Sequence, residues 1–238
     1  DDATTDGWSL VEQEIKNAGT YTLTAKNSDG SRTVQKQVTV SKATSTIAFN
    51  NYALSYTYTG QPLANPTAEQ LTLTGAGYDD VTFTWYEGTS PNGTKLDSAP
   101  TDAGTYYLVA SIPDSNNTTA SEATSGEITI TKATATAAPG ALSVSNNAAK
   151  TYTYDLSQLL PALDDGKTLG EVTYALGTVS LGSYYDSSSP ATISGSTLTL
   201  PIQAVVSDTE GSIGTVTATI SSDNYADMTA TITVSSVI

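Results

Sequence analysis

Carboxylates are the side chains whose grouping first suggests chemistry in this chain, and calcium binding is the chemistry they suggest. They occur as adjacent pairs and as single residues: Asp79-Asp80, Asp164-Asp165, Asp208, Glu210, Asp223 and Asp227. Calcium needs about six to eight convergent oxygen ligands. No helix–loop–helix calcium spacing is present, and Asp165-Gly166 is typical of a tight turn. We therefore expect no metal and no cofactor, and keep a calcium-stiffened adhesin segment as an alternative.

The sequence lacks two residue types that commonly take part in catalysis. The 238 residues contain neither cysteine nor histidine, which excludes thiol nucleophiles, disulfides and histidine bases. No Gly-x-Ser-x-Gly elbow is present, and no pair of carboxylates is marked out for glycoside hydrolysis. We expect no enzymatic activity and no catalytic residues.

Tyrosines offer a second kind of chemistry, the stacking of sugar rings on exposed aromatic side chains. The chain has 14 of them, including Tyr56, Tyr58, Tyr106, Tyr152 and Tyr154 on alternating stretches. An amphipathic ring also suits a half-buried strand, and we favour that structural interpretation. A carbohydrate-binding accessory region is therefore the second alternative.

Lysines offer a third chemistry, because some surface pilins and adhesins carry a bond between a lysine and an asparagine. The candidates are Lys95, Lys132, Lys150 and Lys167. No partner is paired with any of them in the sequence. We expect these lysines to be solvated.

The charge of the chain limits its partners. The formal net charge is -15, and Arg32 is the single arginine, so nucleic acid and anionic membrane surfaces are improbable partners. Residues 1–44 carry five basic and six acidic groups, whereas residues 45–133 and 134–238 each carry two basic and nine acidic groups. Like charge keeps the later parts soluble and mutually repelling. No apolar run is long enough to span a membrane, so we expect no membrane insertion.

A phrase that occurs twice reveals how the chain is organised. Residues 17–26 read NAGTYTLTAK, and residues 102–111 read DAGTYYLVAS. Both are followed by a loop, another alternating stretch and a similar exit, which is VTVSKAT at 38–44 and ITITKAT at 128–134. The exits are about 90 residues apart, so the chain is an array of modules of that length.

The exits place the boundaries between modules at Thr44 and Thr134. We predict an N-terminal segment (residues 1–43) that holds only the closing part of a module. A middle segment (residues 44–133) and a last, divergent segment (residues 134–238) follow, each forming a sandwich. The linkers contain no glycine, so we expect the modules to lie end to end.

Period-two alternation runs through these segments and predicts an all-β fold. Apolar positions alternate with a second set of positions that is mostly threonine in residues 81–86, 106–112, 197–202 and 215–220, as in half-buried antiparallel strands. Asp29-Gly30 and Asn92-Gly93 read as hairpin turns. A helical turn is expected only around Leu156–Leu160, where Pro161 would stop it.

The phrase around Thr101–Leu108 resembles the strand F region of immunoglobulin domains. In that family a tyrosine forms a corner hydrogen bond and a cysteine follows two positions later. The resemblance implies that Tyr106 and Tyr21 are corner tyrosines and that Leu108 and Leu23 replace the cysteine. Trp85 stands where the core tryptophan of strand C would lie. Trp85 and Tyr106 are closer together than in antibody domains, so we expect fewer or shorter middle strands.

A closer resemblance is to the immunoglobulin-like repeats of bacterial surface proteins, including the mostly-β, glycine-rich type. These open with Tyr-x-Tyr-x-Gly-x-Pro, close with Asx-Ala-Gly-Thr-Tyr and are joined by Thr-Lys-Ala, and residues 45–133 match all three. The last segment departs from this pattern, with Asp155-Leu156 in the opening and Ile213-Gly214-Thr215-Val216 near the end.

This resemblance implies tandem immunoglobulin-like β-sandwiches from a longer secreted or cell-wall-anchored bacterial protein. The implied role is a non-catalytic stalk, spacer or adhesion module outside the cell. Its partner would be a host or cell-surface protein or a glycan.

The N-terminal segment is expected to need a partner. We match Trp8 to Trp85, and predict a hairpin closed by Asp29-Gly30 between residues 21–26 and 33–40. Its strands cannot bury an apolar face by themselves. We therefore expect self-association through residues 1–43, or cover from a neighbouring module.

Overall fold

The computed structural model describes residues 7–90, 92–145, 149–203 and 210–237. Regular structure in these residues is β-strand with short 3-10 turns, which confirms the all-β class. The chain forms two compact units. The first comprises Asp1–Ala53, Ala64–Ser98 and Tyr106–Glu127, and the second comprises Leu54–Leu63, Ala99–Thr105 and Ile128–Ile238. The segment boundaries at Thr44 and Thr134 stay predictions.

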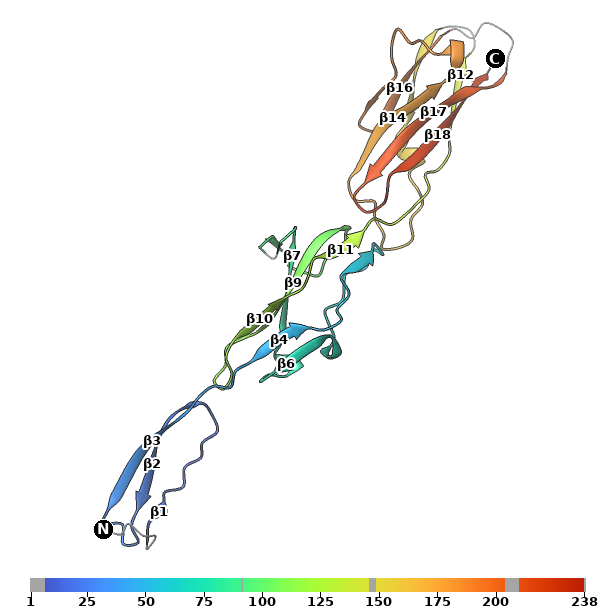
Figure 1. Ribbon diagram of the computed structural model, residues 1–238. Helices are drawn as coiled ribbons and strands as arrows, with labels where there is room; N and C mark the ends of the chain where they lie inside the picture. Colours follow the sequence, from blue (N-terminus) through green and yellow to red (C-terminus); the bar gives the residue numbers. More distant parts are fainter. Residues whose placement is uncertain (1–6, 91, 146–148, 204–209, 238) are drawn as a thin grey trace. The chain divides into compact units, whose positions relative to one another are not determined.

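The first unit begins with an antiparallel sheet in the order β1-β2-β3 (Figure 1). Its strands are β1 (Ser9–Leu10), β2 (Gly19–Lys26) and β3 (Thr33–Val40). The β2–β3 hairpin is confirmed, with Lys26 opposite Thr33 and Gly19 opposite Val40. Gly30 has φ of 74° and Asp29 Oδ1 accepts a hydrogen bond from Ser31 N at 2.8 Å, so the Asp-Gly pair forms the turn.

The match of Trp8 to Trp85 is wrong. Trp85 lies within a strand and is paired with Leu108. Trp8 precedes β1, whose register places Ser9 opposite Lys26 and Leu10 opposite Ala25. The residue that would meet Leu23 in this register is four positions after Trp8. Residue type suggested the match, whereas strand register decides which residues are equivalent.

The rest of the first unit comes from the middle segment. It contains β4 (Thr46–Phe49), η1 (Ala68–Gln70), β6 (Leu71–Thr74), η2 (Tyr78–Asp80), β7 (Thr82–Glu87), β8 (Thr94–Lys95), all but the first two residues of β9 (Gly104–Ile112), and β10 (Ser121–Thr124). β4 pairs with β6, β7 pairs with β8 and β9, and β10 pairs with β9, all antiparallel. The two-residue β8 fits the expectation of short middle strands.

The pair β4–β6 packs its apolar side chains against β9. Ile47 and Leu71 form a buried cluster with Ala110 and Ile112. Alternation explains this arrangement, because residues 106, 108, 110 and 112 of β9 are buried while the positions between them are half-buried. β9 therefore has one inward face along its whole length.

The second unit contains a parallel pair and the last segment. β5 (Ser55–Thr57) pairs in parallel with β11 (Ile128–Thr131). The last segment contributes β12 (Gly140–Ser145), β13 (Lys150–Asp155), η3 (Leu156–Leu159), β14 (Val172–Ser180), η4 (Gly182–Tyr184), β15 (Thr192–Ser194), β16 (Thr197–Ile202), β17 (Gly211–Ser222) and β18 (Met228–Val237). η3 lies where a helical turn was predicted, just before Pro161.

The strand order of the last segment is that of an immunoglobulin-like sandwich. Its described residues form one sheet in the order β12-β18-β17-β14 and another in the order β13-β16-β15. Lettered in chain order from A to G, these are A-G-F-C and B-E-D, with the first strand parallel to the last. An immunoglobulin domain likewise places B, E and D in one sheet and C, F and G in the other. The predicted fold class is therefore confirmed.

Apolar side chains from both sheets fill the core of this sandwich. The fully or nearly fully buried set includes Leu198, Leu200 and Ile202 of β16, Val216, Ala218 and Ile220 of β17, and Ala230, Ile232 and Val234 of β18. The residues between them on β17 and β18 are mostly threonines. The apolar positions of the alternating pattern thus face the interior of the sandwich, and the threonines between them face outward.

Candidate functional sites at the segment junctions

Four of the five residues singled out from the sequence lie on the equivalent strands β2 and β9, whereas Trp85 lies on β7, and the five differ in burial. Trp85 and Tyr106 are each 4% exposed and Leu108 is fully buried. Tyr21 and Leu23 of β2 are half-buried. The Tyr21 hydroxyl donates to Asn17 O at 2.6 Å, four residues earlier, which is the corner hydrogen bond implied by the immunoglobulin resemblance.

The corner tyrosine follows a turn of sequence Asx-Ala-Gly, and this turn is held by an asparagine far away in the sequence. At the first junction, Asn117 lies in the loop between β9 and β10. Its side-chain Oδ1 accepts a hydrogen bond from Ala18 N at 2.8 Å, and its Nδ2 donates to Asn17 Oδ1 at 2.9 Å. One amide side chain therefore contacts both the backbone and the side chain of the turn.

The linker after β3 contacts the same loop. Ala43 N donates to Asn117 O at 2.7 Å, and Thr119 N donates to Ala43 O at 3.0 Å. Ala43 and Thr118 form an isolated parallel bridge. Beside them, Lys42 Nζ forms an ion pair with Asp114 Oδ2 at 2.5 Å. The turn and the linker of the N-terminal segment thus both contact one loop of the middle segment.

The second junction repeats this pattern. Asn224 lies in the loop between β17 and β18. Its Oδ1 accepts a hydrogen bond from Ala103 N at 2.8 Å, and its Nδ2 donates to Asp102 Oδ1 at 2.9 Å. The Nδ2 atom also lies 3.3 Å from Thr168 O, as a second donor contact. Asp102-Ala103 here takes the place of Asn17-Ala18.

The second linker also follows the first. Ala133 N donates to Asn224 O at 2.9 Å, and Ala226 N donates to Ala133 O at 2.8 Å. Ala133 and Tyr225 form an isolated parallel bridge. Lys132 Nζ donates to Ser222 O at 2.6 Å. The lysine of the linker therefore contacts a loop carboxylate at the first junction, and at the second it contacts the carbonyl of the last strand residue before the loop.

We call this repeated set of contacts the junction clamp. It consists of the Asx-Ala-Gly turn and the Lys-Ala linker of one segment, which both bind the loop asparagine of the next. An asparagine suits this position because its amide has an acceptor and two donors in one rigid plane. The backbone bonds on either side of the linker alanine fix its register against the loop. The clamp is a structural site, and it contains no catalytic pair.

The two clamps differ in burial. Asn224 is fully buried, whereas Asn117 is exposed. Around Asn224, the ring of Tyr225 packs edge-on against Tyr58, with 5.6 Å between the ring centroids. The Tyr58 hydroxyl accepts a hydrogen bond from Thr168 N at 2.9 Å. Aromatic packing therefore excludes water from the second clamp.

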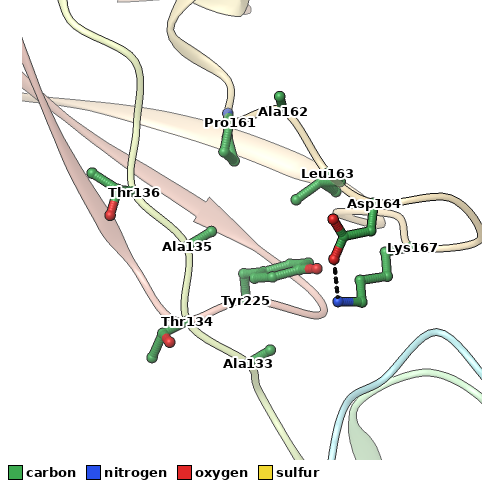
Figure 2. A pocket seen from close by; sticks show the side chains of 10 residues that line it. All are labelled: Ala133, Thr134, Ala135, Thr136, Pro161, Ala162, Leu163, Asp164, Lys167 and Tyr225. Carbon is green, nitrogen blue, oxygen red and sulfur yellow. Dashed lines mark hydrogen bonds and ion pairs between the residues drawn. The ribbon is translucent and has the colours of Figure 1, made fainter.

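An open hollow of about 270 Å³ lies beside the second clamp (Figure 2). Residues Ala133–Thr136 and Pro161–Asp164 line it, together with Lys167 and the ring of Tyr225. Asp164 Oδ2 and Lys167 Nζ are 2.8 Å apart. Their hydrogen bond and opposite charges lower the pKa of Asp164 and raise the pKa of Lys167. Each group is therefore held in its ordinary charged state, which is unsuited to proton transfer.

Other shifted carboxylates belong to turns. Hydrogen bonds from the serine two positions later lower the pKa values of Asp29, Asp155 and Asp186. Asp223, one of the calcium candidates, accepts a hydrogen bond from Glu171 N at 2.7 Å. Asp208 lies outside the described residues. In the ranges that the structure describes, no three acidic side chains gather as a metal site.

Sequence reasoning found half of each clamp. It identified the Asx-Ala-Gly turn and the Lys-Ala linker, because both phrases repeat. It missed Asn117 and Asn224, whose loops read PDSNNTT and SSDNYAD. The two loops share Ser-Asx-Asn, at residues 115–117 and 222–224, and this shared phrase after the strand F stretch is the signal that could have found them.

The comparisons with known proteins give distant structural likenesses. No protein-family model and no curated protein matches the chain. Protocadherin gamma B2 extracellular cadherin domains 1–5 are 10% identical with a TM-score of 0.30, over 93% of this chain and 46% of that chain. Mouse clustered PcdhgC3 EC1-3 is 16% identical with a TM-score of 0.30, over 93% and 77%. The I9-I11 tandem from titin is 12% identical with a TM-score of 0.27, over 99% and 86%.

The chain spans less than half the length of the protocadherin gamma B2 chain that it matches. At TM-scores of this size, the fold is assigned from the strand order of β12–β18 alone. In the part of the chain that the structure describes, no helix is long and apolar enough to cross a membrane.

Proposed function

We propose that this chain is a non-catalytic repeat region that acts as a stalk or spacer. The parent would be a secreted or cell-wall-anchored bacterial surface protein, and the region would lie outside the cell. Adhesion to a host or cell-surface protein or a glycan is part of the same proposal. It is supported by the sequence resemblance to bacterial immunoglobulin-like repeats and by the sandwich fold.

The observation that carries the proposal is the repetition of the junction clamp. Asn117 and Asn224 make the same two bonds to the preceding turn, and Ala43 and Ala133 make the same backbone bonds to the following loop. A spacer must hold each module against the next, and a binding module has no such need. Because each clamp joins the turn and the linker to one loop, pivoting about the linker would break several hydrogen bonds together.

The position of Trp85 argues against a carbohydrate-binding platform. Its ring is 4% exposed, and its Nε1 donates to Asn65 Oδ1 at 3.0 Å. A stacking platform needs an exposed aromatic face. The spacer is therefore the better-supported of these two functions.

Small-angle X-ray scattering tests the proposal. A compact globule of 238 residues would have a radius of gyration of about 18 Å, and we expect a clearly larger value. In the double variant Asn117→Ala and Asn224→Ala, loosened junctions should broaden the distribution of interatomic distances. Asn116→Ala is the matched control, because Asn116 is an exposed neighbour of Asn117 in the same loop.

Two results would contradict the proposal. One is a wild-type radius of gyration near that of a single globule. The other is a double variant whose scattering profile matches that of the wild type and of Asn116→Ala.

A further inference from the structure

The sheet of β1, β2 and β3 has one apolar face and one polar face. Residues directly opposite each other in the register share a face, so Tyr21 lies beside Val38, and Ala25 lies beside Val34 and Leu10. We call the following set the apolar face: Leu10, Tyr21, Leu23, Ala25, Val34, Val38 and Val40. The opposite face carries Thr20, Thr22, Thr24, Lys26, Thr33, Gln35, Gln37 and Thr39. Such a division is typical of a sheet that buries one side.

Much of the apolar face is accessible, although Tyr21, Leu23 and Ala25 of β2 are half-buried. Leu10 is 62% exposed, Val34 is 57% exposed and Val38 is 36% exposed. Every residue of β3 is exposed. A contiguous apolar patch of this kind on a soluble protein marks an interaction surface.

The middle segment shows that the same face is buried when strands cover it. Leu108 and Ala110 of β9 correspond to Leu23 and Ala25 of β2, and both are fully buried. There the pair β4–β6 covers Ala110, which forms one buried cluster with Ile47 and Leu71. The face of β2 therefore has the composition of a sandwich interior, and a second sheet is the occupant that fits it.

We propose that the apolar face binds the apolar face of a second copy of this chain, forming a two-layer sandwich. The charge distribution favours this occupant. Residues 1–44 carry a net charge of -1, from five basic and six acidic groups, whereas each later segment carries -7, from two and nine. Two copies therefore meet with least repulsion through their N-terminal segments.

Lys36 is the one charged side chain on the apolar side of the described strands β1 to β3, and it lies opposite Leu23. β3 is an edge strand of the sheet. A lysine at an edge can lay its carbon chain along the apolar surface and keep its ammonium group in water. Lys36 therefore permits the face-to-face contact, and it limits stacking beyond a pair.

The size of the face predicts a weak dimer. β2 and β3 have eight residues each and β1 has two. Eight-residue strands are about 27 Å long and strands are about 4.8 Å apart, so each face covers roughly 300 Å². A contact of about 600 Å² in total is below the roughly 1,200 Å² of stable complexes. Association should therefore depend on concentration in the micromolar to millimolar range.

Sedimentation equilibrium of the full chain tests the proposal with two neighbouring substitutions. Val38→Lys places a charge on the apolar face, and Gln37→Lys places the same charge on the polar face of the same strand. We expect the wild type and Gln37→Lys to dimerise alike, and Val38→Lys to associate at least about tenfold more weakly. Val38→Thr keeps the β-branched shape of the side chain and should also weaken association. If it does, misfolding does not explain the effect of Val38→Lys.

Crosslinking provides an independent measurement, because the chain has no cysteine. A single Leu23→Cys would face its counterpart across packed sheets about 10 Å apart. A bismaleimide of that reach should link Leu23→Cys into dimers, and should link the opposite-face control Thr22→Cys far less.

Three results would overturn the proposal. They are a wild type that stays monomeric to about millimolar concentration, equal weakening by Val38→Lys and Gln37→Lys, and equal crosslinking at positions 22 and 23. In the first case, binding of a hydrophobic dye to the monomer would show that the apolar face is accessible and still does not self-associate.

Discussion

The two junctions have the same hydrogen bonds in different surroundings. At the first, Asn117 is exposed and the adjoining β2 has half-buried Leu23. At the second, Asn224 is fully buried, and β9, which carries its turn, has fully buried Leu108. Yet the turn alanine donates its N–H to the asparagine Oδ1 over the same distance of 2.8 Å at both junctions. The local phrase therefore determines which bonds form, and the surrounding packing determines how much each bond contributes to stability.

Burial changes this contribution because water competes for exposed groups. An exposed amide that loses its partner can bond to water, whereas a buried one leaves unsatisfied groups behind. The same reasoning holds for leucine, since only a buried side chain leaves a cavity when it is shortened. Paired substitutions at equivalent positions therefore measure the difference between the two junctions directly.

The largest difference is expected between the two leucines. Leu108→Ala should lower the free energy of unfolding by about 2–5 kcal/mol through cavity formation. Leu23→Ala should lower it by about 1 kcal/mol or less, because Leu23 is half-buried. Urea titration at low protein concentration, which avoids association, measures both. Fluorescence of Trp85, which pairs with Leu108, reports the first in a Trp8→Phe background. Equal losses of stability at the two positions would contradict the expected effect of burial.

The two asparagines should show a smaller difference of the same sign. Asn224→Ala should cost about 1–3 kcal/mol, because Ala103 N and Asp102 lose a buried partner. Asn117→Ala should cost about 1 kcal/mol or less, since water can replace the lost bonds. Differential scanning calorimetry measures both, with Asn116→Ala as the control. A larger loss for Asn117→Ala would show that solvent exposure does not determine the contribution of the clamp.

The smallest effect is expected at the linker lysines. The two should differ in how strongly salt changes the stability that each contributes. The Lys42–Asp114 ion pair is exposed, with 37% and 61% of the two side chains accessible, so Lys42→Ala should cost about 0–1 kcal/mol. That loss should vanish at about 1 M salt, where screening acts within about 3 Å. Lys132 donates to the neutral Ser222 carbonyl, and the loss from Lys132→Ala should persist. Melting temperatures at low and high salt test this, and two equal salt dependences would contradict it.

Much of the fold could be predicted because it is encoded locally. Alternation of apolar residues with threonine indicates strands, and Asp29-Gly30 closes a hairpin because glycine adopts positive φ at low cost. The helical turn before Pro161 follows from the same local reasoning. The immunoglobulin-like order of the last segment was predicted by resemblance, and the sheets establish it.

The clamp asparagines could not be predicted in the same way. Asn117 contacts Ala18 across 99 residues, and Asn224 contacts Ala103 across 121 residues. An asparagine in a loop is usually a turn residue, and a single sequence does not indicate which distant backbone group it meets. The error at Trp8 has a related cause, because strand register depends on pairing between strands rather than on residue type.

The clamp also has a direction, and this bears on how such a chain can grow by duplication. The middle segment offers a turn and a linker to the last segment, and accepts the N-terminal segment through its own loop asparagine, Asn117. A copy of residues 44–133 has both halves, so it could be inserted next to itself without any other change in sequence. The last segment has Ile213-Gly214-Thr215 in place of the Asx-Ala-Gly-Thr phrase. Its loop asparagine can therefore bind the turn of a preceding segment, but it has no such turn of its own to bind another loop asparagine. Copy number, rather than new interfaces, would then set the length of the array.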